Sequence, residues 1–366
     1  MKFIPGIQLN ELFYREIVQP ILEEDFPSLA HSAALIGYGS DVLGYDTPTS
    51  MDHNWGLRLK IFLTPADCAK HRDELLKSLR QKLPHSFRGF SVGFSEPDWN
   101  DGGTQRMQTD ENGPVNHLIR AGTIREFIES SLGVDPFGGI TPVDWLTFPE
   151  QALIEITGGK VYHDELDLAS VRAKFAYYPR DVWLYRMAAQ WQRISQEEPF
   201  VGRAGDVGDD VGSRIIAARL ARDVMRLCFL IEKQYAPYSK WFGTAFARLS
   251  CASRLTPILD RALAASEWRV RETYLAEAYS IAAEMHNALG ITEPIEPTIT
   301  NFFSRPYHVI SAGRFVQAIC AVIEDEQLKS LAPIGGIDQF SDSTDLLDNT
   351  PLARRSRVLY EMEQSQ

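Results

Sequence analysis

The chain has 366 residues, more than a single hydrophobic core usually supports, so we expect two domains. It carries 49 acidic and 37 basic residues, a net charge of −12, and this balance argues against non-specific binding to nucleic acid. The N-terminus lacks the apolar segment of a signal peptide, and no apolar run approaches the roughly 20 residues that cross a membrane. We therefore expect a cytoplasmic protein without a membrane or nucleic-acid partner.

The first predicted elements lead into a glycine-rich turn. Residues 10–24 have the apolar spacing of a helix, with Asn10 as the expected N-cap. Residues 33–36 form an apolar run typical of a strand, and the turn Gly-Tyr-Gly-Ser follows at residues 37–40. A turn of this composition allows backbone N–H groups to approach a phosphate closely. These residues alone are also compatible with an ordinary tight turn.

A second strand is predicted over residues 52–63, because apolar residues alternate there with Arg58 and Lys60 on the other face. Asp52 and Asn54 are two positions apart, so on a strand their side chains would point to the same face. Oxygen ligands beside a phosphate cradle are what Mg²⁺-dependent phosphoryl chemistry requires. The simpler alternative is that Asp52 only caps a turn.

The remaining pattern separates strands from helices along the chain. In the first part we predict helices over 64–83, 123–132 and 149–156, strands over 87–95 and 115–121, and a long loop over 96–114. In the second part we predict helices over 165–175, 180–197, 209–235, 237–249, 254–265, 267–288, 306–324 and 350–363. Together they predict an α+β fold with an α/β domain over 1–162 and an α-helical domain over 163–366.

The pattern Gly39-Ser40, eleven residues, then Asp52-His53-Asn54 resembles the nucleotidyltransferase superfamily, whose hallmark is Gly-Ser or Gly-Gly followed by acid-x-acid on the next strand. The sequence of residues 37–56 is similar to that of a bacterial family catalogued as a domain of unknown function. This family is grouped with the kanamycin and streptomycin nucleotidyltransferases. Its members typically have an Asp-His-Asp-Trp-Gly box here. The stretches YYPRDVWLYRMAAQWQRISQEE, VGRAGDVGDDVGSRIIAARL and YAPYSKWFGTAFARL also resemble that family.

The resemblance implies a small mixed-sheet domain carrying the site and a helical domain closing over it. Gly39 and Ser40 would hold the triphosphate, and Asp52 and Asn54 would hold Mg²⁺ as catalytic ligands. Lys240 of the helical domain would contact the triphosphate. Arg214 lies on a predicted helix that follows three acids; it could contact phosphate oxygens, or it could belong to a solvated or ion-paired face. The reaction it implies is Mg²⁺-dependent transfer of a nucleoside monophosphate, most simply AMP from ATP, to a hydroxyl of a small-molecule acceptor.

One alternative follows from a departure from the family pattern. The second acid of the box is Asn54 in this chain, and the predicted strand 115–121 contains no carboxylate that could serve as a third acid. An amide oxygen can ligate a metal but carries no charge. The alternative is therefore a catalytically degenerate member that binds a nucleotide or a partner without transfer. The sequence names neither the acceptor, nor the general base, nor the oligomeric state.

Overall fold

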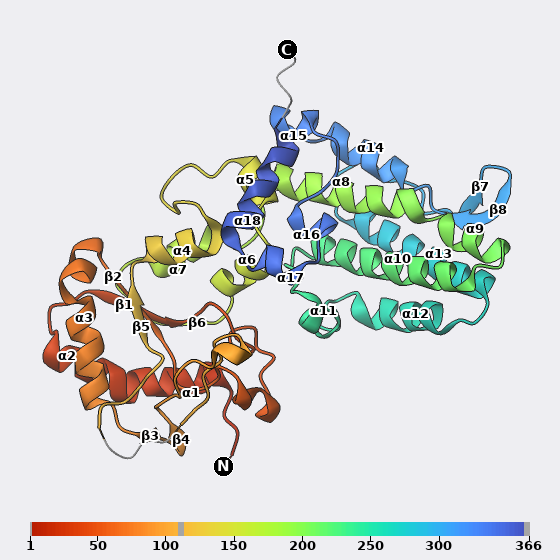
Figure 1. The fold of residues 1–366 in the computed structure, drawn as a ribbon. Coiled ribbons are helices and arrows are strands. Elements are labelled where there is room, and N and C mark those ends of the chain that lie inside the picture. The colour runs from red at the N-terminus through yellow and green to blue at the C-terminus, as the bar shows by residue number, and fades with distance from the viewer. Residues whose placement is uncertain (1, 109–112, 362–366) are drawn as a thin grey trace. The chain divides into compact units, whose positions relative to one another are not determined.

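The structure is a computed structural model that describes residues 2–108 and 113–361 (Figure 1). Strands gather into a mixed sheet in one part of the chain and long helices make up most of the other, so the predicted α+β class is confirmed. Within the described residues, no helix combines the length and apolar character that a membrane crossing requires. The chain divides into two compact units, one of residues 1–139 and 152–176 and the other of residues 140–151 and 177–366.

The first unit is built around a four-stranded sheet of order β5-β2-β1-β6. Strand β1 (His31–Leu35) pairs antiparallel with β2 (Lys60–Leu63) and with β6 (Lys160–Asp164), and β2 pairs parallel with β5 (Arg120–Gly122). All five residues of β1 are buried, as expected for a central strand. Strand β6 was not predicted, and it spans the predicted domain boundary between residues 162 and 163.

Helices flank this sheet in chain order. They are α1 (Gly6–Phe13), a π-helical turn (Tyr14–Val18), α2 (Gln19–Asp25), α3 (Pro65–Lys82), α4 (Ile124–Leu132), α6 (Glu150–Thr157) and α7 (Leu168–Ala173). The predicted caps of α3 and α4 are confirmed: Thr64 accepts from the backbone N–H of Asp67, and Thr123 and Glu126 form a capping box.

Asn10 is not the N-cap of the first helix, so that prediction is wrong. The helix already begins at Gly6, and Asn10 is fully buried inside it. Its Nδ2 donates to the carbonyl oxygen of Gly56 at 3.0 Å, and its Oδ1 accepts from the backbone N–H of Arg58 at 2.8 Å. A buried amide needs partners for both its nitrogen and its oxygen. Asn10 finds them in the backbone of the segment that leads into β2 and so holds that segment against the first helix.

The predicted strand over 87–95 is replaced by a tight hairpin. Its strands are β3 (Ser86–Phe87) and β4 (Phe90–Ser91), joined through Arg88 at φ 50° and Gly89 at φ 86°. Beyond it, isolated bridges join Phe94 to Met107 and Asp98 to Thr104, so the predicted loop is partly paired. Residues 109–112 of that loop lie outside the described residues.

The second unit is mostly helical. Its helices are α5 (Pro142–Leu146), α8 (Arg180–Glu197), α9 (Phe200–Asp206), α10 (Asp210–Ile231), α11 (Ser239–Phe246), α12 (Ala252–Ala264), α13 (Trp268–Ala288), α14 (Gly313–Ala321), α15 (Glu326–Ser330), α16 (Ile337–Phe340), α17 (Thr344–Leu347) and α18 (Thr350–Arg355). Helix α8 packs on α10 and α14, and α13 packs on α10 and α12 (Figure 1).

Two predicted helices of the second unit need correction. The predicted helix over 306–324 is wrong in its first part, where β7 (Thr300–Phe302) and β8 (Arg305–Val309) form a hairpin before α14 begins. The predicted helix over 350–363 ends earlier, and its last two residues lie outside the described part of the chain.

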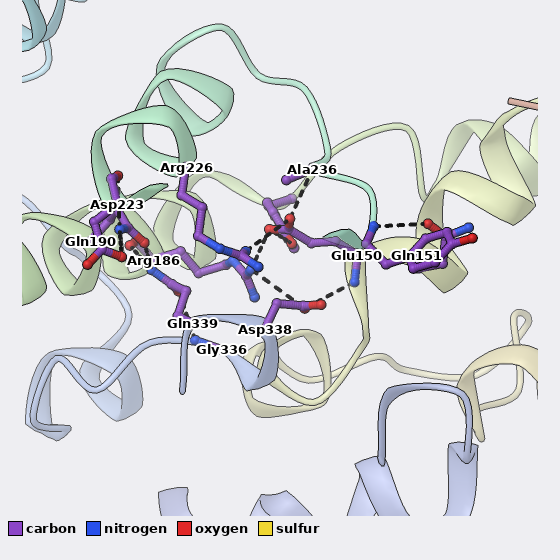
Figure 2. A network of polar contacts seen from close by, with 12 residues as sticks. Glu150, Gln151, Arg186, Gln190, Asp223, Arg226, Ala236, Gly336, Asp338 and Gln339 are labelled. Atoms are coloured by element: carbon purple, nitrogen blue, oxygen red, sulfur yellow. Dashed lines mark hydrogen bonds and ion pairs between the residues drawn. The ribbon is translucent and has the colours of Figure 1, made fainter. Parts of the chain in front are cut away.

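A buried polar network holds the second unit together (Figure 2). Glu150 accepts from Arg186 Nη2 at 2.5 Å, from Tyr178 Oη at 3.1 Å and from the backbone N–H of Ala236 at 3.0 Å. The backbone N–H of Glu150 donates to Asp338 Oδ2 at 3.0 Å. Buried charges are tolerated where partners compensate their desolvation, so these contacts fix segments that are far apart in the sequence.

Candidate functional site

The glycine-rich turn after β1 presents a run of backbone N–H groups. Gly37 and Gly39 have φ angles of 97° and 122°, a region in which a side chain is strained. Among the described residues, the backbone N–H groups of Tyr38, Gly39 and Ser40 donate to no acceptor. Successive unpaired N–H groups in such a turn form a concave site for an anion. The phosphate-binding role of Gly39 and Ser40 stays a prediction.

A buried ion pair between Arg58 and Asp41 packs against this turn. Arg58 Nη2 donates to Asp41 Oδ1 at 2.5 Å and to the carbonyl oxygen of Tyr38 at 2.6 Å, and its guanidinium lies 4.7 Å from the centre of the Tyr38 ring. Burial acts to lower the pKa of Arg58, but the Asp41 carboxylate outweighs it and the pKa is raised. A Cβ on Gly39 would collide with both side chains. Arg58 therefore shapes the turn while its own charge is balanced.

Lys60 and Arg120 add two cations beside the turn. The β2–β5 register pairs these residues directly. A Cβ built on Gly37 would lie 3.8 Å from Lys60 Nζ, so the ammonium stands next to the turn. Neither side chain has a hydrogen bond or ion pair within the described residues. Burial, Arg58 and Arg120 lower the pKa of Lys60, and the charge of Glu155 acts in the opposite direction. An anion bound here would offset two cations that form no ion pair within the described residues.

Two adjoining pockets open at these cations. The smaller, of about 180 Å³, is lined by Leu35, Ile36, Tyr38, Arg58, Leu59, Lys60, Leu118 and Arg120. The larger, of about 330 Å³, shares Lys60 and Arg120 with it and continues to Thr123 and Phe127 of the α4 region. Cationic groups set in apolar walls are suited to phosphates, because the low local dielectric strengthens their attraction.

Sequence reasoning missed Lys60 and Arg120 as site residues. A signal for the first existed, because Lys60 alternates with apolar residues in the segment that becomes β2. Arg120 becomes its neighbour only through the parallel pairing of β2 with β5, which has no local signature in the sequence.

Asp52 and Asn54 do not lie on a strand, so the prediction that they share a strand face is wrong. Asp52 ends a 3-10 helix (Pro48–Asp52), and β2 begins only at Lys60. A capping box starting at Thr47 and the proline after it favour this helical turn. Asn54 has φ 48°, in the left-handed region that asparagine adopts more readily than most residues.

Asn54 already has a structural role. Its backbone N–H donates to the carbonyl oxygen of Gln105 at 3.0 Å, and its Oδ1 accepts from the backbone N–H of Gln105 at 2.9 Å. These two hydrogen bonds connect the loop before β2 to the paired loop after β4. A second lone pair of Oδ1 remains for a metal ion. The predicted metal-binding role of Asn54 stays a prediction.

Asp52 is exposed beside a histidine. Its Oδ2 lies 3.0 Å from His53 Nδ1, and His53 Nε2 lies 3.6 Å from Asp101 Oδ2. The hydrogen bond from His53 lowers the pKa of Asp52, which favours its carboxylate form. In the described part of the chain, Asp52 belongs to no group of three His, Cys, Asp or Glu ligands. It offers one carboxylate to a metal ion.

The two predicted nucleotide contacts of the second unit lie at its surface. Lys240 is exposed, with its Nζ 5.1 Å from the centre of the Trp241 ring. Arg214 is exposed and pairs with Asp210 one helical turn earlier, with Nε to Oδ2 at 2.7 Å. Such a pair contributes little to stability, so Arg214 can exchange partners at low cost. The nucleotide contacts of Lys240 and Arg214 stay predictions.

Another arginine-lined pocket, of about 290 Å³, lies in the second unit. Its arginines have carboxylate neighbours. Arg193 pairs with Asp223, Arg219 with Glu197, Arg222 with Asp342, and Arg226 with Glu150. The charges in this pocket are therefore largely balanced within the protein. Lys60 and Arg120 form no ion pair within the described residues, which makes the pocket of the first unit the stronger candidate for an anion.

Comparisons with known proteins give two matches. Residues 145–242 match the sequence model of a family described as "Domain of unknown function (DUF4037)". No curated protein matches the chain. Among solved structures, a nucleotidyltransferase-like protein from Exiguobacterium sibiricum 255-15 is similar at 10% sequence identity and a TM-score of 0.34, over 81% of this chain and 82% of that one. At that TM-score the likeness carries no conclusion about fold or activity. About a quarter of the chain thus resembles a family without an assigned function.

Proposed function

We propose that this chain is a nucleotidyltransferase-like protein that binds a nucleoside triphosphate, most simply ATP. Its phosphates would lie against the turn at residues 37–40 and the pocket of Lys60 and Arg120. The observation that carries the proposal is that Lys60 and Arg120, which form no ion pair among the described residues, line one pocket with Tyr38 of a turn whose residues 38–40 have no acceptor for their backbone N–H groups there. Both kinds of group favour a polyanion.

The proposed reaction transfers a nucleoside monophosphate to a hydroxyl of a small molecule. The acceptor oxygen attacks the α-phosphorus, the bond from that phosphorus to the oxygen bridging to the β-phosphate breaks, and pyrophosphate leaves. A base takes the hydroxyl proton. Lys60 and Arg120 would stabilise the negative charge that builds on the departing pyrophosphate. Lys240 and Arg214 are further proposed contacts for the nucleotide.

Mg²⁺ is part of the proposal and would neutralise phosphate charge when bound. The donor set available is the Asp52 carboxylate and the second lone pair of Asn54 Oδ1. Mg²⁺ often takes one or two carboxylates together with substrate phosphates and water, and this set meets that requirement at its lower limit. The lowered pKa of Asp52 keeps its carboxylate charged at neutral pH.

An assay of pyrophosphate release tests the reaction. The full chain is incubated with Mg²⁺, each of four nucleoside triphosphates and a pool of hydroxylated small molecules. We expect release that depends on the acceptor and falls at least about a hundredfold in Asp52→Ala, because charge stabilisation at the phosphates is lost. The matched control is Asp101→Ala, which removes the other carboxylate beside His53 and should retain activity.

Asn54→Asp gives a second readout. An aspartate can keep the acceptor role toward Gln105, so the fold is preserved while a charge is added. Increased release in this variant would support a metal-binding role at position 54. Triphosphate binding without pyrophosphate release from any acceptor, unchanged in both variants, would contradict transfer and leave a nucleotide-binding protein.

A further inference from the structure

Three metal-binding side chains meet at the far end of β1 from the glycine-rich turn. His31 is the first residue of β1, His163 lies in β6, and Glu165 follows the end of β6. Ala33 pairs with His163, and the backbone N–H of Glu165 donates to the carbonyl oxygen of His31 at 3.2 Å. Residues two apart on a strand and directly opposite across a pair share one face of the sheet. The antiparallel pairing therefore brings the three side chains together.

Their donor atoms are already close. His163 Nε2 lies 3.2 Å from Glu165 Oε2, and His31 Nδ1 lies 4.0 Å from the same oxygen. One donor atom from each of the three side chains lies within 4.8 Å of the others. Ligand bonds of about 2.0–2.1 Å in a tetrahedral site separate donor atoms by about 3.4 Å. Shifts of about an ångström would complete the geometry.

The two imidazoles are held against each other. Their ring centres lie 4.4 Å apart in a stacked geometry. His163 Nε2 is buried, and its neighbour within the described residues is Glu165 Oε2 at 3.2 Å, without the angle of a good hydrogen bond. A metal ion binds the neutral form of an imidazole, in which one ring nitrogen has a free lone pair.

Tyr14 can orient the ring of His31. Tyr14 Oη lies 2.8 Å from His31 Nε2. His31 Nδ1 lies 3.2 Å from the carbonyl oxygen of Leu29, so a metal ion on Nδ1 would replace that hydrogen bond, and the ring proton would then lie on Nε2 and be donated to Tyr14. Burial raises the pKa of Tyr14 above its ordinary value, so its hydroxyl stays neutral and can accept that bond.

We propose that His31, His163 and Glu165 bind one divalent transition-metal ion, with Zn²⁺ as the favoured ion. Two imidazole nitrogens and one carboxylate oxygen suit Zn²⁺, whereas Mg²⁺ and Ca²⁺ prefer sites made of oxygen alone. The bound ion would join β1 to β6 and bridge His163 Nε2 to the Glu165 carboxylate. This site is separate from the proposed nucleotide site, and neither proposal depends on the other.

Metal titration of the full, untagged chain tests the proposal. The protein is first dialysed against a chelator, and Zn²⁺ binding is then followed by calorimetry, with Co²⁺ absorption as a report of tetrahedral coordination. We expect one equivalent of Zn²⁺ per chain, a raised melting temperature with Zn²⁺, and no competition from excess Mg²⁺. His163→Ala and Glu165→Gln should each lower the affinity at least about tenfold.

His71→Ala is the matched control, because His71 lies 3.8 Å from Glu74 in a pair without a second imidazole. It should leave Zn²⁺ binding unchanged. Glu165→Gln decides the matter if His163→Ala does not fold, since the half-exposed Glu165 can be replaced by an amide that still accepts from the backbone N–H of His31. Absence of saturable Zn²⁺ binding in the wild type, or equal affinity in wild type and Glu165→Gln, would overturn the proposal.

Discussion

Lys60 and Arg120 are direct neighbours on the parallel strands β2 and β5, and neither side chain forms an ion pair or hydrogen bond among the described residues. Like charges placed side by side on a sheet are unfavourable. The lowered pKa of Lys60 has burial as its largest cause, followed by the charges of Arg58 and Arg120. A polyanion would relieve that repulsion, so this pair is the physical basis of the proposed nucleotide site.

The pH dependence of nucleotide binding should report the charge of Lys60. Its pKa is lowered in the free protein, and a bound phosphate raises it, so binding takes up protons. The affinity for ATP is then highest at neutral pH and falls as the pH rises, beginning below the ordinary lysine pKa of 10.5. In Lys60→Arg this alkaline decline should move to higher pH. Calorimetry across the pH range measures both, and identical profiles would contradict a role for Lys60.

Substitution of Gly39 should destabilise the first unit. In Gly39→Ala the new Cβ collides with the Arg58 guanidinium and the Asp41 carboxylate, and the residue stays at φ 122°. We expect a loss of about 2 kcal/mol or more in the free energy of unfolding. Gly139→Ala is the control, because a Cβ there meets no atom within 4 Å. Denaturant unfolding compares the two, and an equal effect of both variants would refute the close approach at Gly39.

Loss of Arg186 should be far more damaging than loss of Arg214. Arg186 is fully buried, and its Nη2 lies 2.5 Å from Glu150 Oε1. Arg186→Ala leaves Glu150 buried without its main partner and should cost about 3–5 kcal/mol. Arg214→Ala removes an exposed pair and should cost less than about 1 kcal/mol. Thermal or denaturant unfolding distinguishes them, and similar losses would show that the network in Figure 2 does not hold the second unit together.

Asp338 should make the stability fall with rising pH in the acid range. Burial and the neighbouring Glu150 raise its pKa from 3.8 to about 6. Between these values the folded state keeps a proton that the unfolded state has lost, so the free energy of unfolding falls by up to about 1.4 kcal/mol per pH unit and levels off above about pH 6.

Other carboxylates also titrate in this range, so the useful quantity is the difference in unfolding free energy between the wild type and Asp338→Asn. From pH 4 to pH 6 the wild type should lose unfolding free energy relative to Asp338→Asn. A constant difference would show that folding does not raise the pKa of Asp338.

The sequence predicts local elements well where their signals are local. Helix α8 runs over the predicted residues 180–197, and the capping residue Thr123 opens α4 as expected. Predictions fail where contacts between residues far apart in the sequence determine the local structure. Asn10 carries an N-cap residue type, yet its partners Gly56 and Arg58 hold it inside the first helix.

The candidate site also contains parts that local signals predicted and parts that they did not. The turn at residues 37–40 is evident from its glycines, and the structure has the positive φ angles that they allow. Alternating residues suggested a strand from Asp52, but the capping box at Thr47 and the pairing of Asn54 with Gln105 produce a helical turn and a loop there. Arg120 enters the site only through strand pairing, which a local pattern does not encode.

The most direct test of the central proposal is the dissociation constant of Mg²⁺-ATP, measured by calorimetry for the wild type and for Lys60→Gln, Arg120→Gln and Arg125→Gln. Arg125 is the matched control, since it is an exposed cation of the same unit whose charge is paired with Asp135. We predict a saturable site that weakens at least about tenfold in the first two variants and is unchanged in the third. Absence of binding in the wild type, or equal dissociation constants in all four proteins, would contradict the proposed nucleotide site.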